Sequence, residues 1–393
     1  MLAASDLVAR PAVQRALDWL GSHADATVYD AITICEIPAP TFQEAERGAW
    51  VERQFRELGL ADVDTDEVGN VYGRRPGKGG GGSILLAAHL DTVFPAGTPI
   101  AVRRAYNRLY APGLVDNSIA VASLLALARA LDASTVATDG DIWLVATVGE
   151  EGLGNLRGIR AACDRLGERV AAVVAVEGQG LGRLYTGAIG SRRYKITVRA
   201  PGGHSWGDFG ARSAIHELFK LGAVVASLEV PAEPKVSYNI GVIGGGTSVN
   251  TIAEEAHCLL DMRSGDGVGL ADIERRVMAL VEEARATPDV VVETQLIGDR
   301  PAGSIAEDHP LIQAGVEALT ALNAGEAGFP IIFTEGSTDA NIPLSRGIPA
   351  TCVAITTGGG THTLSEFLDP EPVALGLKQL ALLTLAVTGV ANA

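Results

Sequence analysis

Four short apolar segments of this chain each lead into histidine or acidic residues. The segments and the residues that follow them are Ile84–Ala88 with His89, Ile142–Val148 with Glu150 and Glu151, Ala171–Val176 with Glu177, and Ala350–Ile355 with, after three glycines, His362. Apolar runs of this length are typical of strands buried on both faces of a parallel sheet. Such sheets bind ligands outside the carboxyl ends of their strands, so we expect these side chains to meet in one site.

Helical patterns alternate with these strands and predict the fold class. Pro11–Leu20 and Glu44–Leu58 have helical spacing, and Asn117 with Ser118 is expected to cap an apolar helix that runs to about Leu131. The chain is therefore expected to adopt an α/β fold in which a mostly parallel sheet is flanked by helices.

A second domain is predicted between residues 191 and 300. There the pattern becomes strand-helix-strand-strand-helix-strand, which is the ferredoxin-like α+β arrangement, βαββαβ. The expected elements are Tyr194–Val198, Ala211–Leu228, Val236–Ile243, Ala256–Met262, Leu270–Ala286 and Val290–Leu296. We therefore expect this domain to be inserted into a catalytic domain made of residues 1–190 and 301–393.

Charge and cysteine usage limit the partners and the location. The 393 residues include 31 basic and 47 acidic side chains, which give a formal net charge of −16. An acidic surface repels nucleic acid and anionic membranes, so neither is expected as a partner. The sequence shows no signal-peptide pattern, and no segment is expected to reach the roughly 20 apolar residues that span a bilayer. The four cysteines are widely spaced, as in buried thiols of a reducing compartment, so a cytoplasmic location is expected.

Each candidate residue also has an ordinary structural interpretation. A single histidine at a strand end is more often a hydrogen-bonded structural residue than a metal ligand, and a Glu-Glu pair is usually a solvated turn. Asp116 with Asn117 is, by itself, a plain helix cap. Their joint placement favours a metal site, because carboxylates that follow buried strands need compensating charge. The chain has no Gly-x-Ser-x-Gly motif, which disfavours a serine hydrolase.

Taken together, these motifs resemble the co-catalytic dizinc exopeptidases and deacylases that include aminoacylase, glutamate carboxypeptidase, acetylornithine deacetylase and tripeptidase T. Their order and spacing fit over nearly the whole chain. The resemblance implies that His89 and Glu177 bind one metal ion, that Glu151 and His362 bind the other, and that Asp116 bridges the two. Histidine and carboxylate ligands without a thiolate suit zinc, with cobalt or manganese as alternatives.

The same resemblance implies roles for five further residues. Asp91 would hydrogen-bond the first histidine of the metal site, and Glu150 would be the general base. The inserted domain would be a lid and dimerisation domain, so a homodimer is expected. In it, His204 would reach the active site of the partner subunit and stabilise an oxyanion. Asn250 and Arg263 would help to bind the substrate, with Arg263 suited to a carboxylate.

Some positions depart from the family pattern and leave the substrate open. Asn117 stands where relatives often have a second Asp, and Ala253 stands where many carry Pro. Glu177 is typical of deacylases and carboxypeptidases, whereas Glu307–Pro310 and Gly336–Ile342 look closer to tripeptidase-T-like proteins. The first expectation is an exopeptidase that acts on di- or tripeptides. The alternatives are an N-acyl-amino-acid deacylase, a glutamate-type carboxypeptidase and, further off, an inactive binding protein of the same fold.

Overall fold

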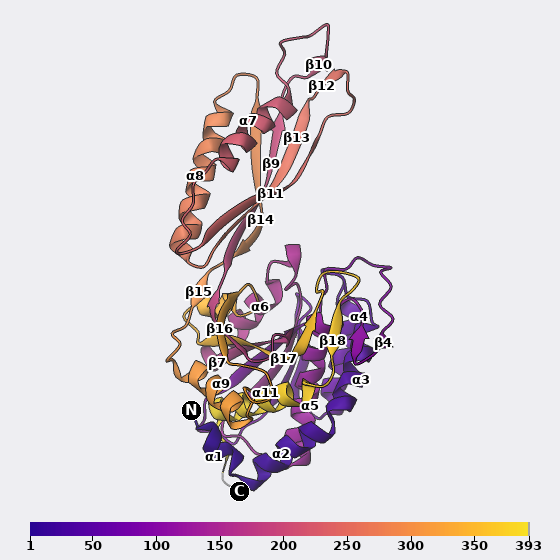
Figure 1. Ribbon diagram of the computed structural model, residues 1–393, viewed down its shortest axis with the longest axis vertical. Coiled ribbons are helices and arrows are strands. Elements are labelled where there is room, and N and C mark those ends of the chain that lie inside the picture. The colour runs from indigo at the N-terminus through magenta and orange to yellow at the C-terminus, as the bar shows by residue number, and fades with distance from the viewer. Residues whose placement is uncertain (392–393) are drawn as a thin grey trace. The chain divides into compact units, whose positions relative to one another are not determined.

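The computed structural model of the chain describes residues 1–391, and these fall into two compact units. The first unit consists of Met1–Gly187 and the chain from Ser304 onward, and the second spans Ala188–Gly303. The sequence predicted an inserted domain at residues 191–300, close to these bounds. Figure 1 shows the elements of each unit.

The first unit is built on a sheet whose centre is parallel. Its strands, in spatial order, are β1 (Ala61–Thr65), β2 (Val71–Arg75), β6 (Ile142–Thr147), β3 (Ile84–His89), β7 (Ala172–Gln179), β17 (Ala350–Gly359), β18 (Phe367–Asp369), β5 (Arg108–Tyr110) and β4 (Arg103–Ala105). Strands β6, β3, β7 and β17 are parallel neighbours, whereas the outer strands pair antiparallel. Every residue of β3 and β6 is buried, which confirms the apolar runs as internal strands.

Helices flank this sheet. They are α1 (Ala4–Val8), α2 (Pro11–Ser22), α3 (Ala24–Cys35), α4 (Ala45–Glu57), α5 (Ile119–Ala133), α6 (Arg157–Leu166), α9 (Pro310–Ala321), α10 (Asn341–Ser345) and α11 (Val373–Thr388), with short turns η1 (Leu114–Ser118), η2 (Gly152–Gly154) and η3 (Gly167–Arg169). Helices α5 and α11 contact the central strands and pack against α2 and α3, and α4 lies against β2. The expected α/β fold is confirmed.

The start of α5 differs from the sequence prediction. Asn117 does not cap this helix; its side-chain amide instead donates to the carbonyl oxygen of Val176, at 2.8 Å. The hydroxyl of Ser118 donates to the Gly113 carbonyl oxygen at 2.6 Å. Asp116 and Asn117 have non-helical dihedral angles in the turn before the helix. The side chain of Asn117 therefore holds this turn against β7, and the helix begins at Ile119, directly after Ser118.

One apolar segment is longer than expected from the sequence. Leu114–Ala133, which joins η1 to α5, is long and apolar enough to cross a membrane by length and composition alone. Most of this segment is buried inside the first unit, where α5 packs on β3 and β7. Burial within the protein core accounts for its composition, since a helix covered on all sides needs no polar face.

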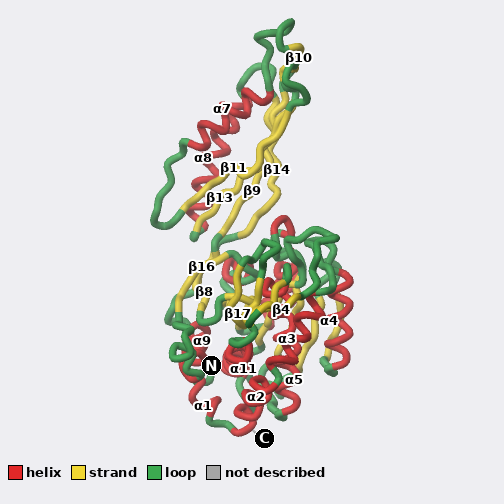
Figure 2. The backbone as a smooth tube through the Cα atoms, turned by 45° about the vertical axis from the view of Figure 1, so that its right-hand side comes forward, coloured by secondary structure: helices red, strands yellow, loops and turns green. Residues whose placement is uncertain are grey.

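The second unit is an antiparallel sheet covered by two helices on one face. In chain order its main elements are β9 (Gly190–Arg199), α7 (Ala214–Ala226), β11 (Val236–Gly245), β13 (Glu255–Ser264), α8 (Gly267–Arg285) and β14 (Val291–Arg300). The sheet order β11-β13-β9-β14 confirms the predicted βαββαβ arrangement. Both views show α7 and α8 on the same side of the strands (Figure 2). Residues of β13 alternate between buried and partly exposed, as a sheet with one covered face requires.

Two small sheets complete the structure. Strands β10 (Gly203–His204) and β12 (Thr251–Ile252) form a short antiparallel pair within the second unit. Strands β15 (Gly303–Ser304), β8 (Arg183–Ala188) and β16 (Ile332–Gly336) form the other sheet. The four cysteines are buried and form no disulfide within the described residues.

Candidate metal centre

The acidic and histidine side chains predicted from the sequence meet at the carboxyl ends of the parallel strands. His89 is the last residue of β3, Glu150 and Glu151 follow β6, and Glu177 lies near the end of β7. Asp116 comes from η1 and His362 from the loop after β17. Three overlapping groups of these residues have ligand atoms within 4.8 Å of one another: His89, Asp116 and Glu177; His89, Glu150 and Glu151; and Asp116, Glu151 and His362.

Asp116 lies between the two histidines. Its Oδ1 is 3.1 Å from Nε2 of His89, and its Oδ2 is 3.3 Å from Nε2 of His362. Oε2 of Glu177 lies 3.6 Å from Nε2 of His89, and Oε1 of Glu151 lies 2.9 Å from Nε2 of His362. Each histidine therefore has its own carboxylate and shares Asp116. The side chains therefore form two groups of nitrogen and oxygen donors that have the Asp116 carboxylate in common.

Close packing of charged groups shifts their pKa values. Burial alone would lower the pKa of His89, but the carboxylates of Glu177 and Asp116 raise it well above its usual value. Hydrogen bonds to Asp116 and Glu151 raise the pKa of His362 to about 10. Burial raises the pKa of Glu177 to about 7, although His89 opposes this shift. Burial would also raise the pKa of Asp116, yet the two histidines hold it well below its usual range.

Asp91 supports the site in a different way from the one expected. Its carboxylate lies 3.8 Å from Nδ1 of His89, too far for a hydrogen bond, and Nδ1 contacts the Asp91 backbone carbonyl instead, at 3.0 Å. The carboxylate accepts the backbone N–H groups of Glu150 and Glu151, at 2.9 and 3.0 Å, and the hydroxyl of Thr41. Asp91 is completely buried. It therefore orients the histidine through its backbone and holds the Glu-Glu loop through its side chain.

A second acid, Glu366, which was not predicted from the sequence, holds the turn that carries Asp116. Oε1 of Glu366 accepts the backbone N–H groups of Val115 and Asp116, at 3.0 and 3.1 Å. Glu366 is fully buried, and burial raises its pKa to about 7. In the sequence it follows His362 in a polar stretch that is typical of an exposed loop. Its role arises from its packing against the turn that carries Asp116, which lies 250 residues earlier in the chain.

Three further hydrogen bonds hold the end of β6 and the residues that follow it. Glu44 accepts the backbone N–H of Gly149 at 3.1 Å and a side-chain N–H of Arg157 at 2.8 Å. Thr147 donates its hydroxyl to the buried carboxylate of Asp339 at 2.6 Å. From the sequence, Glu44 was expected at a helix start, and Asp339 belongs to the segment Gly336–Ile342 that resembles tripeptidase-T-like proteins. The contacts of these acids with Gly149 and Thr147 could not be predicted from the sequence, because the residues of each pair lie more than 100 positions apart.

The candidate residues of the second unit do not form one cluster within it. His204 is exposed, and its Nδ1 accepts the backbone N–H groups of Trp206 and Gly207, both at 3.2 Å. Asn250 lies beside it, since the Asn250 carbonyl accepts the N–H of the residue after His204. Arg263 lies on β13, where it pairs with Asp261 at 2.7 Å. Nδ1 of His204 acts as an acceptor, so its proton is on Nε2, which can donate.

Comparison with known proteins identifies the family. A family model described as peptidase family M20/M25/M40 matches residues 85–386, most of the chain and both units. The chain belongs to this family. It is therefore an M20-family metallohydrolase, and its clustered histidine and carboxylate side chains are candidates for the dinuclear metal centre.

Individual relatives are distant in sequence and close in fold. The chain is 28% identical over 261 residues to succinyl-diaminopimelate desuccinylase of Corynebacterium glutamicum. The aligned region covers 63% of this chain and 69% of that protein. A tripeptidase from Staphylococcus aureus superposes with a TM-score of 0.76 at 20% identity, over 93% of this chain and 98% of that one. A dinuclear metal-binding M20 peptidase from Bacillus subtilis gives 0.68 at 17% identity, over 94% and 99%. These structural likenesses establish the fold.

Proposed function

We propose that this protein hydrolyses an amide bond in small peptides as an exopeptidase, with two divalent metal ions, zinc first among the candidates. His89 and Glu177 would hold one ion, Glu151 and His362 the other, and Asp116 would bridge them. The observation that supports this most is that the two oxygens of Asp116 face two different histidines, at 3.1 and 3.3 Å. A single metal ion or a purely structural ion pair would not require that arrangement.

The donor set fits such ions chemically. Several buried carboxylates lie within a few ångströms of one another, and this crowding is costly without added positive charge. When bound, the ions would polarise the scissile carbonyl and lower the pKa of an attacking water. Glu150, which is 5% exposed, is held beside the ligands by the bond from its backbone N–H to Asp91. It would accept the proton of that water and deliver it to the leaving amine.

The substrate class rests on the relatives and on one ligand position. The likeness to a tripeptidase favours short peptides. The likeness to a desuccinylase favours an alternative, the removal of an acyl group from an N-acyl amino acid, and Glu177 fits that alternative. Both reactions cleave an amide next to a free carboxylate or amine and need the same catalytic groups.

Hydrolysis of a substrate panel tests the proposal. The purified metal-loaded protein should cleave dipeptides or tripeptides faster than N-acyl amino acids, and chelation should abolish the activity. Glu150→Gln, which keeps the size of the side chain, should lower kcat by at least about a hundredfold because it cannot accept a proton. Its metal content should equal that of the wild type, which serves as the control. Preference for N-acyl amino acids would select the alternative, and full activity of Glu150→Gln would refute the proposed base.

We extend the proposal to His204 as a donor to the oxyanion, supplied by the partner subunit of a homodimer. Its Nε2–H is free to donate because Nδ1 accepts two backbone N–H groups. Mixing inactive Glu150→Gln with inactive His204→Ala under conditions of subunit exchange tests this. Roughly a quarter of the wild-type activity should return, because half of the dimers would carry one intact site. No recovery after proven exchange would place His204 in the site of its own chain or outside the mechanism.

A further inference from the structure

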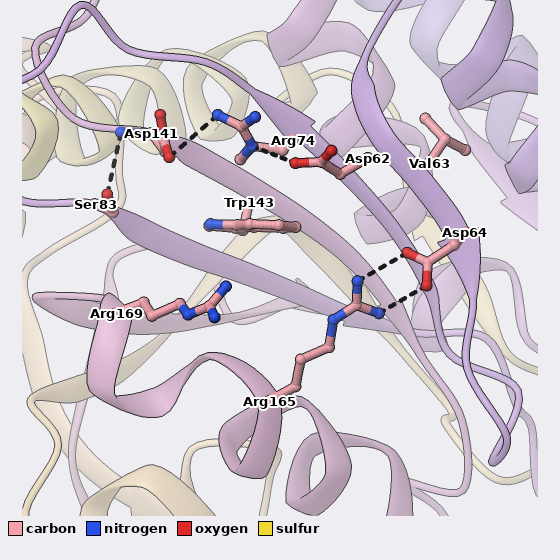
Figure 3. A pocket seen from close by; sticks show the side chains of 9 residues that line it. All are labelled: Asp62, Val63, Asp64, Arg74, Ser83, Asp141, Trp143, Arg165 and Arg169. Carbon is pink, nitrogen blue, oxygen red and sulfur yellow. Dashed lines mark hydrogen bonds and ion pairs between the residues drawn. The ribbon is translucent and has the colours of Figure 1, made fainter.

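A cavity of about 590 Å³ lies in the first unit at the end of the sheet opposite to the metal centre. Ser83 and Asp141, which line it, immediately precede strands β3 and β6. The metal ligands lie at the other ends of these same strands. Figure 3 shows the cavity with Trp143 of β6 at its middle. The cavity is thus a separate site, and any ligand bound in it would be independent of the proposed hydrolytic function.

Trp143 brings an unused hydrogen-bond donor to this cavity. Its side chain is 6% exposed, yet its indole N–H donates to no acceptor within residues 1–391. The guanidinium of Arg74 lies over its ring, 5.8 Å from the centroid. Most of the Trp143 side chain is covered, and its indole N–H faces the cavity, where it can donate to whatever occupies it. The nitrogen therefore points to a ligand or ordered solvent in the cavity.

Arg169 brings a positive charge without a counter-ion. Its guanidinium lines the same cavity, and in Figure 3 it lies on the side to which the indole nitrogen is turned. Within the described part of the chain, it forms no ion pair or hydrogen bond. The other arginines of the cavity differ in this respect, since Arg74 pairs with Asp62 and Asp141, and Arg165 pairs with Asp64 through two bonds.

Ser83 adds a third donor. Its Oγ accepts the backbone N–H of Asp141 at 3.2 Å, and its own hydroxyl proton has no acceptor among the described residues. Three kinds of donor therefore line one hollow: an indole N–H, a guanidinium and a hydroxyl. The carboxylates around these donors already have partners. Asp62 accepts from Arg74, Asp64 accepts from Arg165, and Asp141 accepts from the backbone N–H of Gly77.

We infer that this cavity binds a small oxyanion, a carboxylate or a phosphate, between Trp143 and Arg169. An oxyanion accepts several hydrogen bonds at once and would accept from both the Trp143 indole N–H and the Arg169 guanidinium. The three arginines and three aspartates of the lining cancel in formal charge, so attraction comes from the local donors rather than from a net positive field. The dissociation constant is accordingly expected to be on the order of 1 mM.

Indole N–H signals provide a site-specific test on the metal-loaded protein. The chain has four tryptophans, so ¹⁵N-tryptophan labelling gives four indole signals, and Trp143→Phe identifies the one that belongs to Trp143. Inorganic phosphate and acetate are titrated separately, and their relative affinities decide which oxyanion the site prefers. Arg169→Gln is the test variant. Arg53→Gln, which removes an equal charge from the exposed face of α4, is its matched control.

The expected result is a saturable shift of the Trp143 signal by at least one of the two anions. Arg169→Gln should weaken that binding about tenfold, a factor that corresponds to about 1.4 kcal/mol, while Arg53→Gln should leave it unchanged. No saturable shift with either anion would overturn the inference. An unchanged affinity in Arg169→Gln would also overturn it, because an anion bound only at the metal centre would shift the signal indirectly and without Arg169.

Discussion

At the scale of single residues, the site consists of closely spaced carboxylates that face only two histidines as sources of positive charge. His89 and His362 face Asp116, Glu177 and Glu151 at 2.9 to 3.6 Å. In the metal-free protein, the raised pKa values mean that both histidines keep a proton at neutral pH. A histidine must lose that proton from its ligating nitrogen to bind a metal ion. Metal uptake should therefore release protons, and metal affinity should rise with pH up to about 10, where His362 loses its proton unaided.

Glu366 is the residue whose effect we expect to be largest among those that touch no metal ion. Glu366→Ala removes the acceptor of two backbone N–H groups, one of which belongs to Asp116, so metal affinity or activity should fall about tenfold to a hundredfold. Glu366→Gln keeps an oxygen acceptor of the same size and should retain most of the activity. Metal content and kcat/KM of both variants measure this. Equal activity of Glu366→Ala and wild type would show that the turn holds Asp116 without Glu366.

At the scale of elements, the turn η1 is placed by its contact with strand β7. A Cβ atom on Gly178 would lie 1.7 Å from the Val115 carbonyl oxygen, so no larger residue fits without a backbone shift. Asn117 adds a hydrogen bond from the same turn to Val176 of this strand. The close approach of β7 therefore sets where Asp116 stands relative to Glu177.

Gly178→Ala tests this contact. The substitution should destabilise the protein by about 1–3 kcal/mol and also reduce metal content, because the backbone next to Asp116 must move. Gly325→Ala is the control, since a Cβ there would meet nothing within 4 Å. Urea unfolding and metal analysis of the two variants provide the measurements. A Gly178→Ala protein with wild-type stability and metal content would show that β7 does not set the position of the turn.

The sequence predicts elements better than the contacts between them. Runs such as Ile84–Ala88 are apolar throughout and so identify buried strands, and the residues after them mark one edge of the sheet. The role of Asn117 could not be predicted, because a helix cap and a bond to a neighbouring strand use the same side chain. Glu366 was missed for a related reason, since its burial depends on chain packing that local composition does not reveal.

At the scale of the whole molecule, the chain combines a catalytic unit with an inserted unit. All the proposed metal ligands and Glu150 lie in the first unit, whereas His204, Asn250 and Arg263 lie in the second. The second unit's role as a lid and dimerisation domain stays a prediction, as does the cytoplasmic location. Metal binding therefore tests the first unit alone.

The proposed dinuclear centre can be tested by calorimetric titration of zinc into the metal-free protein. Runs at about pH 8 in two buffers of different ionisation enthalpy give the number of ions bound and the number of protons released. We predict about two zinc ions per chain, with net release of protons from the histidines. Binding of one ion or none would contradict a dinuclear centre built on Asp116, His89 and His362. Binding of two ions without proton release would instead contradict the raised pKa values of the two histidines.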